Sequence, residues 1–256
     1  MGGWRVVPVS VTGPEHLRQG TENQDAFAHL RLGDLTVLAV ADGAGSAARS
    51  ATGARLAVEA ACDAASLLDG PDPGRSGRSA GARRYAGRVL GLFDRRLDRL
   101  IDETGGERGD YATTLLAVVA RPPAYVFLAV GDSFLVVEHR GAGPHLLVPP
   151  DNGASRGSTV FLTSAGRDAA VRCGLIEDPE ITGLALCSDG VLDAVLAAGR
   201  DAGGGPSLLA PADFTAYLHM FADRAARPAA LSDRLQSPDF TASSGDDKTM
   251  VLAVRA

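Results

Sequence analysis

Short apolar runs recur along the chain, and Gly, Asp or Pro residues separate them. This pattern is typical of strands that are buried on at least one face. The runs predicted to form strands are Thr36–Ala41, Thr114–Ala120, Tyr125–Val130, Phe134–Glu138, Val160–Thr163, Gly183–Cys187 and Thr249–Val254. Two of them flank the short turn Gly131-Asp132-Ser133, which predicts an antiparallel hairpin.

Apolar residues at helical spacing predict three helices between these strands, over Ser46–Leu68, Arg83–Glu103 and Pro211–Ala226. The third begins with a proline, which is favoured in the first turn of a helix. Two stretches rich in Gly and Pro, Gly70–Gly81 and Asp201–Ser207, predict loops. A strand, a helix pair and then a run of strands favour an α+β fold, such as a β-sandwich flanked by helices.

Composition limits the broad class of the protein. With 256 residues, 45% of them hydrophobic, the chain can bury one sizeable core, so we expect a single domain over residues 1–256. The formal net charge of −6 provides no broad basic surface for nucleic acid or an anionic membrane, so neither is an expected partner. Any recognition of phosphate must therefore be local.

The cysteines indicate a compartment. Cys62, Cys173 and Cys187 are far apart in the sequence and form no CxxC pair, and any disulfide would leave one thiol over. This pattern favours a reducing compartment, and we expect the cytoplasm. No apolar run approaches the ~18 residues of a membrane-spanning helix, and the first residues lack the apolar core of a signal peptide.

Acidic residues stand at the ends of three predicted strands. Asp42 follows Thr36–Ala41, Asp189 comes two residues after Cys187, and Asp246 precedes the strand that begins at Thr249. Hard divalent cations such as Mg²⁺ and Mn²⁺ prefer carboxylate, carbonyl and water oxygens, whereas the chain has no His or Cys cluster typical of zinc. Each Asp-Gly motif alone is more typical of a turn, but together they favour a metal site.

Taken in order, the motifs extend over most of the chain. They are Asn23-Gln24-Asp25, Asp42-Gly43-Ala44-Gly45, Thr113-Thr114, Gly131-Asp132-Ser133, Ser188-Asp189-Gly190 and Asp246-Asp247-Lys248-Thr249. This series resembles the metal-dependent protein phosphatases of type 2C, in particular a bacterial branch with a histidine upstream of the Asn-Gln-Asp motif. The resemblance implies two antiparallel sheets in a sandwich, an antiparallel helix pair on each outer face, and a site for two Mn²⁺ or Mg²⁺ ions at one end.

The resemblance also implies a role for each acid at this site. Asp42 would bridge two metal ions, and the carbonyl of Gly43 would bind the second. Asp189 and Asp246 would complete the first. Asp25 would act through water.

A third, weaker metal ion is implied at Asp132, with Asp189 and Asp193 beside it. Alternatively, Asp132 is an ordinary hairpin-turn residue and Asp193 a helix-start carboxylate. Asp247 stands where the family usually has Asn, and it would lie behind the metal ligands and add negative charge.

The position at which many family members carry a phosphate-binding arginine is Gly20 here. His16 and Arg18, just upstream, are the candidates to bind phosphate in its place, and Arg49 is a third. A lone histidine is equally typical of packing. The histidine that often follows Asp-Gly in the family is Ala44.

The chemistry implied is phosphoester hydrolysis by a hydroxide shared between two metal ions, without a covalent intermediate. Ser46, Ser133 and Ser188 show no Ser-His-Asp pattern and are expected to be turn or cap residues. The favoured function is a serine/threonine protein phosphatase that acts on a phosphoprotein and opposes a kinase. Alternatives are a catalytically weak relative that binds a phosphoprotein or kinase, and a small-molecule phosphatase.

Overall fold

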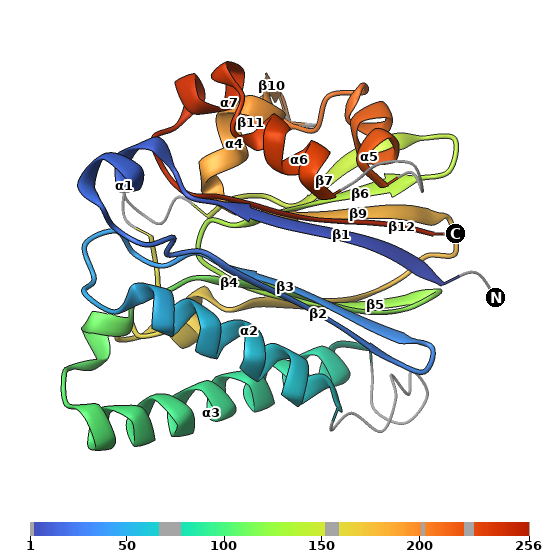
Figure 1. Ribbon diagram of the computed structural model, residues 1–256. Helices are drawn as coiled ribbons and strands as arrows, with labels where there is room; N and C mark the ends of the chain where they lie inside the picture. The colour runs from blue at the N-terminus through green and yellow to red at the C-terminus, as the bar shows by residue number, and fades with distance from the viewer. Residues whose placement is uncertain (1–2, 67–77, 152–158, 201–202, 223–227, 256) are drawn as a thin grey trace.

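Two five-stranded antiparallel sheets face each other in the computed structural model, which describes residues 3–66, 78–151, 159–200, 203–222 and 228–255 (Figure 1). Sheet one has the order β1-β12-β9-β6-β7, and sheet two has the order β2-β3-β4-β5-β8. The strands of sheet one are β1 (Trp4–Val11), β6 (Phe134–His139), β7 (Gly143–Val148), β9 (Ile181–Cys187) and β12 (Lys248–Arg255). Those of sheet two are β2 (Ala26–Leu32), β3 (Leu35–Ala41), β4 (Leu115–Arg121), β5 (Ala124–Val130) and β8 (Arg172–Glu177).

Helices cover the outer face of each sheet (Figure 1). On sheet two lie α2 (Ser50–Ser66) and α3 (Arg78–Thr104), and on sheet one lie α5 (Phe214–Ala222) and α6 (Pro228–Leu235). The shorter elements are α1 (Pro14–Gln19), α4 (Leu192–Val195), α7 (Pro238–Ser243), the 3₁₀ turns η1 (Arg108–Tyr111), η2 (Arg167–Ala170) and η3 (Asp189–Val191), and the hairpin β10 (Ala197–Arg200) with β11 (Pro206–Leu209). This arrangement confirms the predicted α+β sandwich in four layers.

The central strands are apolar throughout because both of their faces are buried. In β3, Val37 and Ala39 face the helices, whereas Leu38 and Val40 lie between the sheets. Every residue of β3 is buried. Strands buried on both faces are selected for continuous rather than alternating hydrophobicity, which is why the sequence shows unbroken runs.

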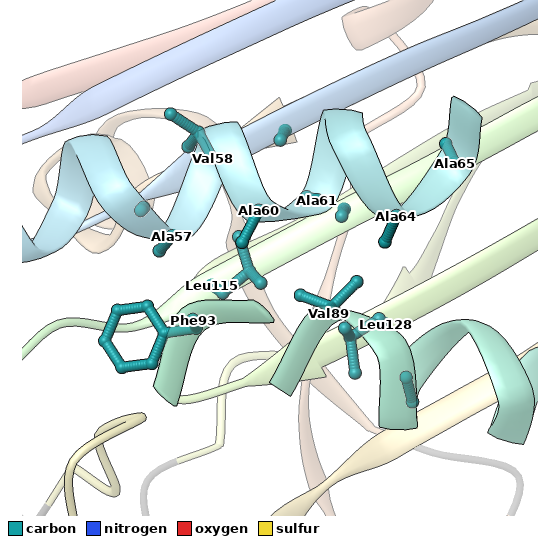
Figure 2. Packing of buried hydrophobic residues seen from close by; sticks show 14 of the residues in the cluster. Ala57, Val58, Ala60, Ala61, Ala64, Ala65, Val89, Phe93, Leu115 and Leu128 are labelled. Carbon is teal, nitrogen blue, oxygen red and sulfur yellow. The ribbon is translucent and has the colours of Figure 1, made fainter. Parts of the chain in front are cut away.

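Small side chains bring the helix layer close to sheet two. Helix α2 buries a row of alanines, among them Ala57, Ala60 and Ala64, and Val89 and Phe93 of α3 belong to the same cluster (Figure 2). Alanine has the highest helix propensity and occupies little volume, so the same residues favour the helix and allow close packing.

The predicted hairpin around Gly131-Asp132-Ser133 is wrong. Strand β5 pairs with β4 and β8 in sheet two, whereas β6 pairs with β7 and β9 in sheet one. Gly131 has a φ of +98°, and Arg172 Nη2 donates to its carbonyl at 2.8 Å. The segment therefore passes from one sheet to the other. The sequence does not predict this, because two fully apolar runs do not specify which neighbour each strand pairs with.

The predicted strand Val160–Thr163 is also wrong. Its apolar residues are buried or half-buried without a strand partner: Leu162 is fully buried in the helix-side cluster, and its amide donates to the Thr113 carbonyl at 2.8 Å. Ser164 closes a turn directly after it by donating to the Phe161 carbonyl. Burial alone explains the apolar pattern here.

Element ends differ from the predictions by a few residues. Helix α2 begins at Ser50 rather than Ser46, and α5 begins at Phe214 rather than Pro211. Of the predicted loop Gly70–Gly81, residues 78–81 already belong to α3, and residues 70–77 lie outside the described residues. In Asp201–Ser207, Pro206 already belongs to β11, and residues 201–202 are outside the described part.

Two other findings concern the cysteines and membrane-spanning helices. Cys62, Cys173 and Cys187 are all free thiols. Within the described residues, no helix combines the length and the apolar character that crossing a bilayer requires.

One glycine in α2 is required by close packing against η1. A β-carbon at Gly53 would lie 2.1 Å from the Tyr111 carbonyl oxygen, whereas at Gly87, exposed on α3, it would meet nothing within 4 Å. We predict that Gly53→Ala lowers the free energy of unfolding by about 1–3 kcal/mol through overpacking. Gly87→Ala, the matched control, should raise it by about 0.4–1 kcal/mol by restricting the unfolded chain. Urea denaturation measures both, and equal effects would contradict the packing argument.

Candidate metal centre

The three strand-end acids lie at one end of the sandwich. Asp42 follows β3 and Asp189 follows β9, whereas Asp246 precedes β12, which runs antiparallel to β9 with Met250 opposite Cys187. The structure thus brings together residues from both sheets that are up to 204 positions apart, as 246 − 42 shows. Their charges act on one another: Asp189 and Asp246 each raise the pKa of Asp42.

The backbone at Asp42 and Gly43 is clamped from two sides. The Asp42 amide donates to Thr114 Oγ1 at 2.9 Å, and its carbonyl accepts from the Thr114 amide at 2.8 Å and from Thr113 Oγ1 at 3.0 Å. On the other side, a β-carbon at Gly43 would lie 2.7 Å from the Gln24 carbonyl oxygen. Only glycine fits here, and the two threonines hold the Asp42 main chain in place.

Burial raises the pKa of several of these carboxyls. It raises that of Asp25 to about 7 and that of Asp189 to about 6, and it raises that of Asp42 well above its usual range. Nearby carboxylates add to the effect. Asp189 Oδ1 is also buried without a hydrogen-bond partner. An oxygen-rich group of acids with an unsatisfied buried oxygen fits a hard divalent cation, which would offset the repulsion and fill that coordination.

Asp25 is fixed by a hydrogen-bond chain that crosses between the sheets. Its carboxylate accepts from Ser188 Oγ at 2.8 Å, and Ser188 Oγ in turn accepts from the Thr249 amide at 3.0 Å. Asn23 accepts from the Asp25 amide at 2.9 Å and donates to Ser10 Oγ at 2.9 Å. The Asn-Gln-Asp motif is thereby tied to β1 through Ser10, and to β12 and the end of β9 through Ser188.

Asp247 joins three segments behind the acids. Its two carboxylate oxygens accept from the Gly13 amide at 2.7 Å and the Gln24 amide at 2.6 Å, and His16 Nδ1 lies 2.9 Å from Oδ2. Ligand atoms of His16, Asp246 and Asp247 lie within 4.8 Å of one another. His16 is buried, and its Nδ1 lies beside Asp247 without making a hydrogen bond.

Of the other candidates to bind phosphate, Arg18 is exposed on α1, whereas Arg49 is engaged elsewhere. Arg49 Nη1 donates to Tyr111 Oη at 2.6 Å and to the Gly105 carbonyl, and its guanidinium stacks on the Tyr111 ring at 5.5 Å. Gly20 ends α1 with a φ of +68°, a conformation that an arginine adopts only with strain.

The acids assigned to a third metal ion are placed differently. Asp132 accepts a hydrogen bond from Thr159, and burial raises its pKa; its charge in turn raises the pKa of Asp189. It therefore belongs to the same electrostatic cluster, although as a residue of the segment between the sheets rather than of a hairpin. Asp193 is exposed in the first turn of α4.

Two basic residues near the acids were missed as site residues. Lys248, the one lysine of the chain, is 1% exposed, and its Nζ donates to the carbonyls of Ser244 and Asp246 at 2.8 and 2.7 Å. Arg172 donates to the carbonyls of Pro149 and Gly131 at 2.6 and 2.8 Å, directly beside Asp132. The only sign of these two residues in the sequence is a basic side chain at the start of an apolar segment, which does not by itself indicate a site.

Comparison with known proteins supports the family resemblance. The family model described as protein phosphatase 2C matches residues 12–236. A search of curated protein sequences finds no significant match.

Similar solved structures come from bacteria. The serine/threonine phosphatase PstP/Ppp of Mycobacterium tuberculosis has 17% identity and a TM-score of 0.59 over 98% of both chains. PppA, a regulatory component of the type VI secretion system in Pseudomonas aeruginosa, has 18% identity and a TM-score of 0.62 over 99% of this chain and 98% of its own. The catalytic domain of PstP with two manganese ions has 18% identity and a TM-score of 0.60 over 98% and 97%. With a family model that covers most of its length, the chain belongs to the protein phosphatase 2C family.

Proposed function

We propose that this chain is a metal-dependent phosphatase of phosphoserine and phosphothreonine in proteins. The observation that carries the proposal is the group of carboxylates from both sheets, with raised pKa values and an unpartnered buried oxygen on Asp189. Its membership of the protein phosphatase 2C family gives the reaction class. The physiological substrate would be a phosphoprotein, with a protein kinase as the opposing enzyme.

The residues proposed to hold two Mn²⁺ or Mg²⁺ ions are Asp42, the carbonyl of Gly43, Asp189 and Asp246, with Asp25 acting through water. When bound, such ions would lower the pKa of a water so that it can act as the nucleophile at neutral pH, and they would supply positive charge for the phosphoryl oxygens. The hydrogen bonds from Thr113 and Thr114 hold the main chain of Asp42 in place, so this residue would need little rearrangement to bind a metal ion.

The chain's own residues would also bind the substrate phosphate. Arg18 is exposed on α1, two residues from His16. A guanidinium matches a phosphoryl group by paired hydrogen bonds. Because Arg49 is held by Tyr111 and Gly105, we assign phosphate binding to Arg18 and His16 rather than to Arg49.

A second candidate is a catalytically weak relative that binds a phosphoprotein or kinase. It is favoured by one observation: the family's phosphate-binding arginine is replaced by Gly20, which the left-handed end of α1 requires. Assay of the purified protein on a phosphothreonine peptide with Mn²⁺, Mg²⁺ or chelator separates the two. Turnover that depends on metal supports the enzyme, whereas binding without turnover supports the alternative.

The first prediction concerns the ligands. Asp42→Ala, Asp189→Ala and Asp246→Ala should each reduce Mn²⁺-dependent hydrolysis of an aryl phosphate by at least about 100-fold, since each removes part of the metal site. Asp102→Ala, which removes an exposed carboxylate on α3, is the control and should keep wild-type turnover. In chelator, the three variants should be no less stable than wild type in urea, because each removes a carboxylate that the neighbouring acids repel. Wild-type turnover in any of the three would contradict its assignment.

The second prediction concerns phosphate binding. Arg18→Ala should raise KM for a phosphothreonine peptide by about tenfold through loss of a charged hydrogen bond, with metal affinity unchanged. His16→Ala should also raise KM, and it should lower the free energy of unfolding by about 1–3 kcal/mol because Asp247 loses a partner. Gln19→Ala on the same helix is the control. If KM stays at the wild-type value in both variants, phosphate is bound elsewhere.

The third prediction concerns Asp132, proposed to hold a weak third metal ion. Asp132→Ala should retain two tightly bound Mn²⁺ ions in calorimetric titration, because the other ligands remain, while kcat falls by about tenfold or more. The dependence of rate on millimolar metal should weaken as well. A wild-type kcat would make Asp132 a structural partner of Thr159 only, and loss of tight binding would place it in the two-metal site.

A further inference from the structure

A cavity lies at the end of the sandwich opposite the metal centre. It has a volume of about 420 Å³, and its lining includes Trp4, Arg31, Asp34, Arg121 and Arg255. Trp4 begins β1 and lies opposite Arg255, the last residue of β12, in the strand register. In Figure 1 this is the end at which N and C are marked. Since β12 starts at the metal centre, the two sites are about 25 Å apart, the length of an eight-residue strand.

The cavity is basic although the chain is acidic. Three arginines line it against one aspartate, whereas the whole chain has a formal charge of −6. Asp34 Oδ1 lies 3.2 Å from Arg121 Nη2 and offsets one of the three charges. The guanidinium of Arg31 lies at the mouth, where Nη2 would be 2.8 Å from a β-carbon at Gly3. Within the described lining, an excess of positive charge therefore remains.

Two hydrogen-bond donors in the lining residues have no acceptor. Trp4 Nε1 and Arg121 Nε are both buried from solvent and without a hydrogen-bond partner. Buried donors in folded proteins are normally paired, and an unpaired one indicates a missing acceptor. Trp4 also contacts Tyr125 edge to face, with ring centroids 6.2 Å apart, so its indole is held in place.

We propose that this cavity binds a small ligand through a phosphoryl group. The group supplies negative charge and acceptor oxygens for the guanidinium groups that line the cavity. Guanidinium groups bind anionic oxygens in pairs, and a phosphoryl group offers three such oxygens to the arginines, whereas a carboxylate offers two and chloride none. The volume is within the range of pockets for small molecules and exceeds what a bare phosphate needs, and the indole ring offers an apolar surface for the remainder of the ligand. This inference does not depend on the proposed phosphatase activity.

The sole tryptophan of the chain gives a direct test, because Trp4 supplies the only indole N–H signal in a ¹⁵N-labelled sample. Full-length protein freed of divalent cations is titrated with inorganic phosphate, adenosine monophosphate and, at equal ionic strength, chloride. We expect a saturable shift of the indole signal with the two phosphoryl compounds and none with chloride. Tighter binding of the nucleotide would identify an organic phosphate as the ligand, and equal binding would identify phosphate itself.

Substitutions in the cavity provide the second arm. Arg31→Gln and Arg121→Gln should each raise the Kd about tenfold, the loss of one charged hydrogen bond. Arg99→Gln, the same change at an exposed position on α3, should leave it unchanged. Arg31 is exposed, so that variant remains informative if loss of the Asp34 pair unfolds Arg121→Gln. No saturable shift, an equal shift with chloride, or a wild-type Kd in every folded cavity variant would overturn the proposal.

Discussion

Burial and mutual repulsion act together on the carboxylates of Asp25, Asp42 and Asp189, and the surrounding structure is organised around that concentration of negative charge. The donors nearest to it are largely used elsewhere. Lys248 donates to two backbone carbonyls, and the amides of Gly13 and Gln24 donate to Asp247. A polypeptide that keeps such acids together leaves their charge to be balanced by a cation from solution, which is the physical reason to propose a metal site here.

Close backbone contacts prevent the acids from moving apart. A β-carbon at Gly190 would lie 1.9 Å from the Asp247 carbonyl oxygen, and one at Gly13 would lie 2.2 Å from the Asp246 carbonyl carbon. The loops that carry Asp189, Asp246 and Asp247 are thus held in place by close main-chain contacts. The repulsion among the acids is resisted by packing and hydrogen bonds that have little freedom to relax.

The sequence allowed prediction wherever a local pattern determines the outcome. Acids that follow or precede continuous apolar strands end up at the sandwich end, and Asp42, Asp189 and Asp246 follow that rule. The pairing of β5 and β6 with strands of different sheets could not be predicted, because a run that is apolar on both faces contains no information about its neighbour. Strands β1, β2, β7 and β8 were missed, since their burial is only partial. The contact of Arg49 with Tyr111 could not be predicted either, because the two residues are 62 positions apart in the sequence.

The position of β12 in sheet one has a consequence for biosynthesis. This last strand lies between β1 and β9, and Asp246 and Asp247 immediately precede it. A chain made from its N-terminus therefore holds β1 without its hydrogen-bonded neighbour, and the amides of Gly13 and Gln24 without their common acceptor, until residues 247–255 have been added. Sheet one closes and the acid cluster is completed in the same late step, so a ribosome-bound intermediate that lacks these residues has neither.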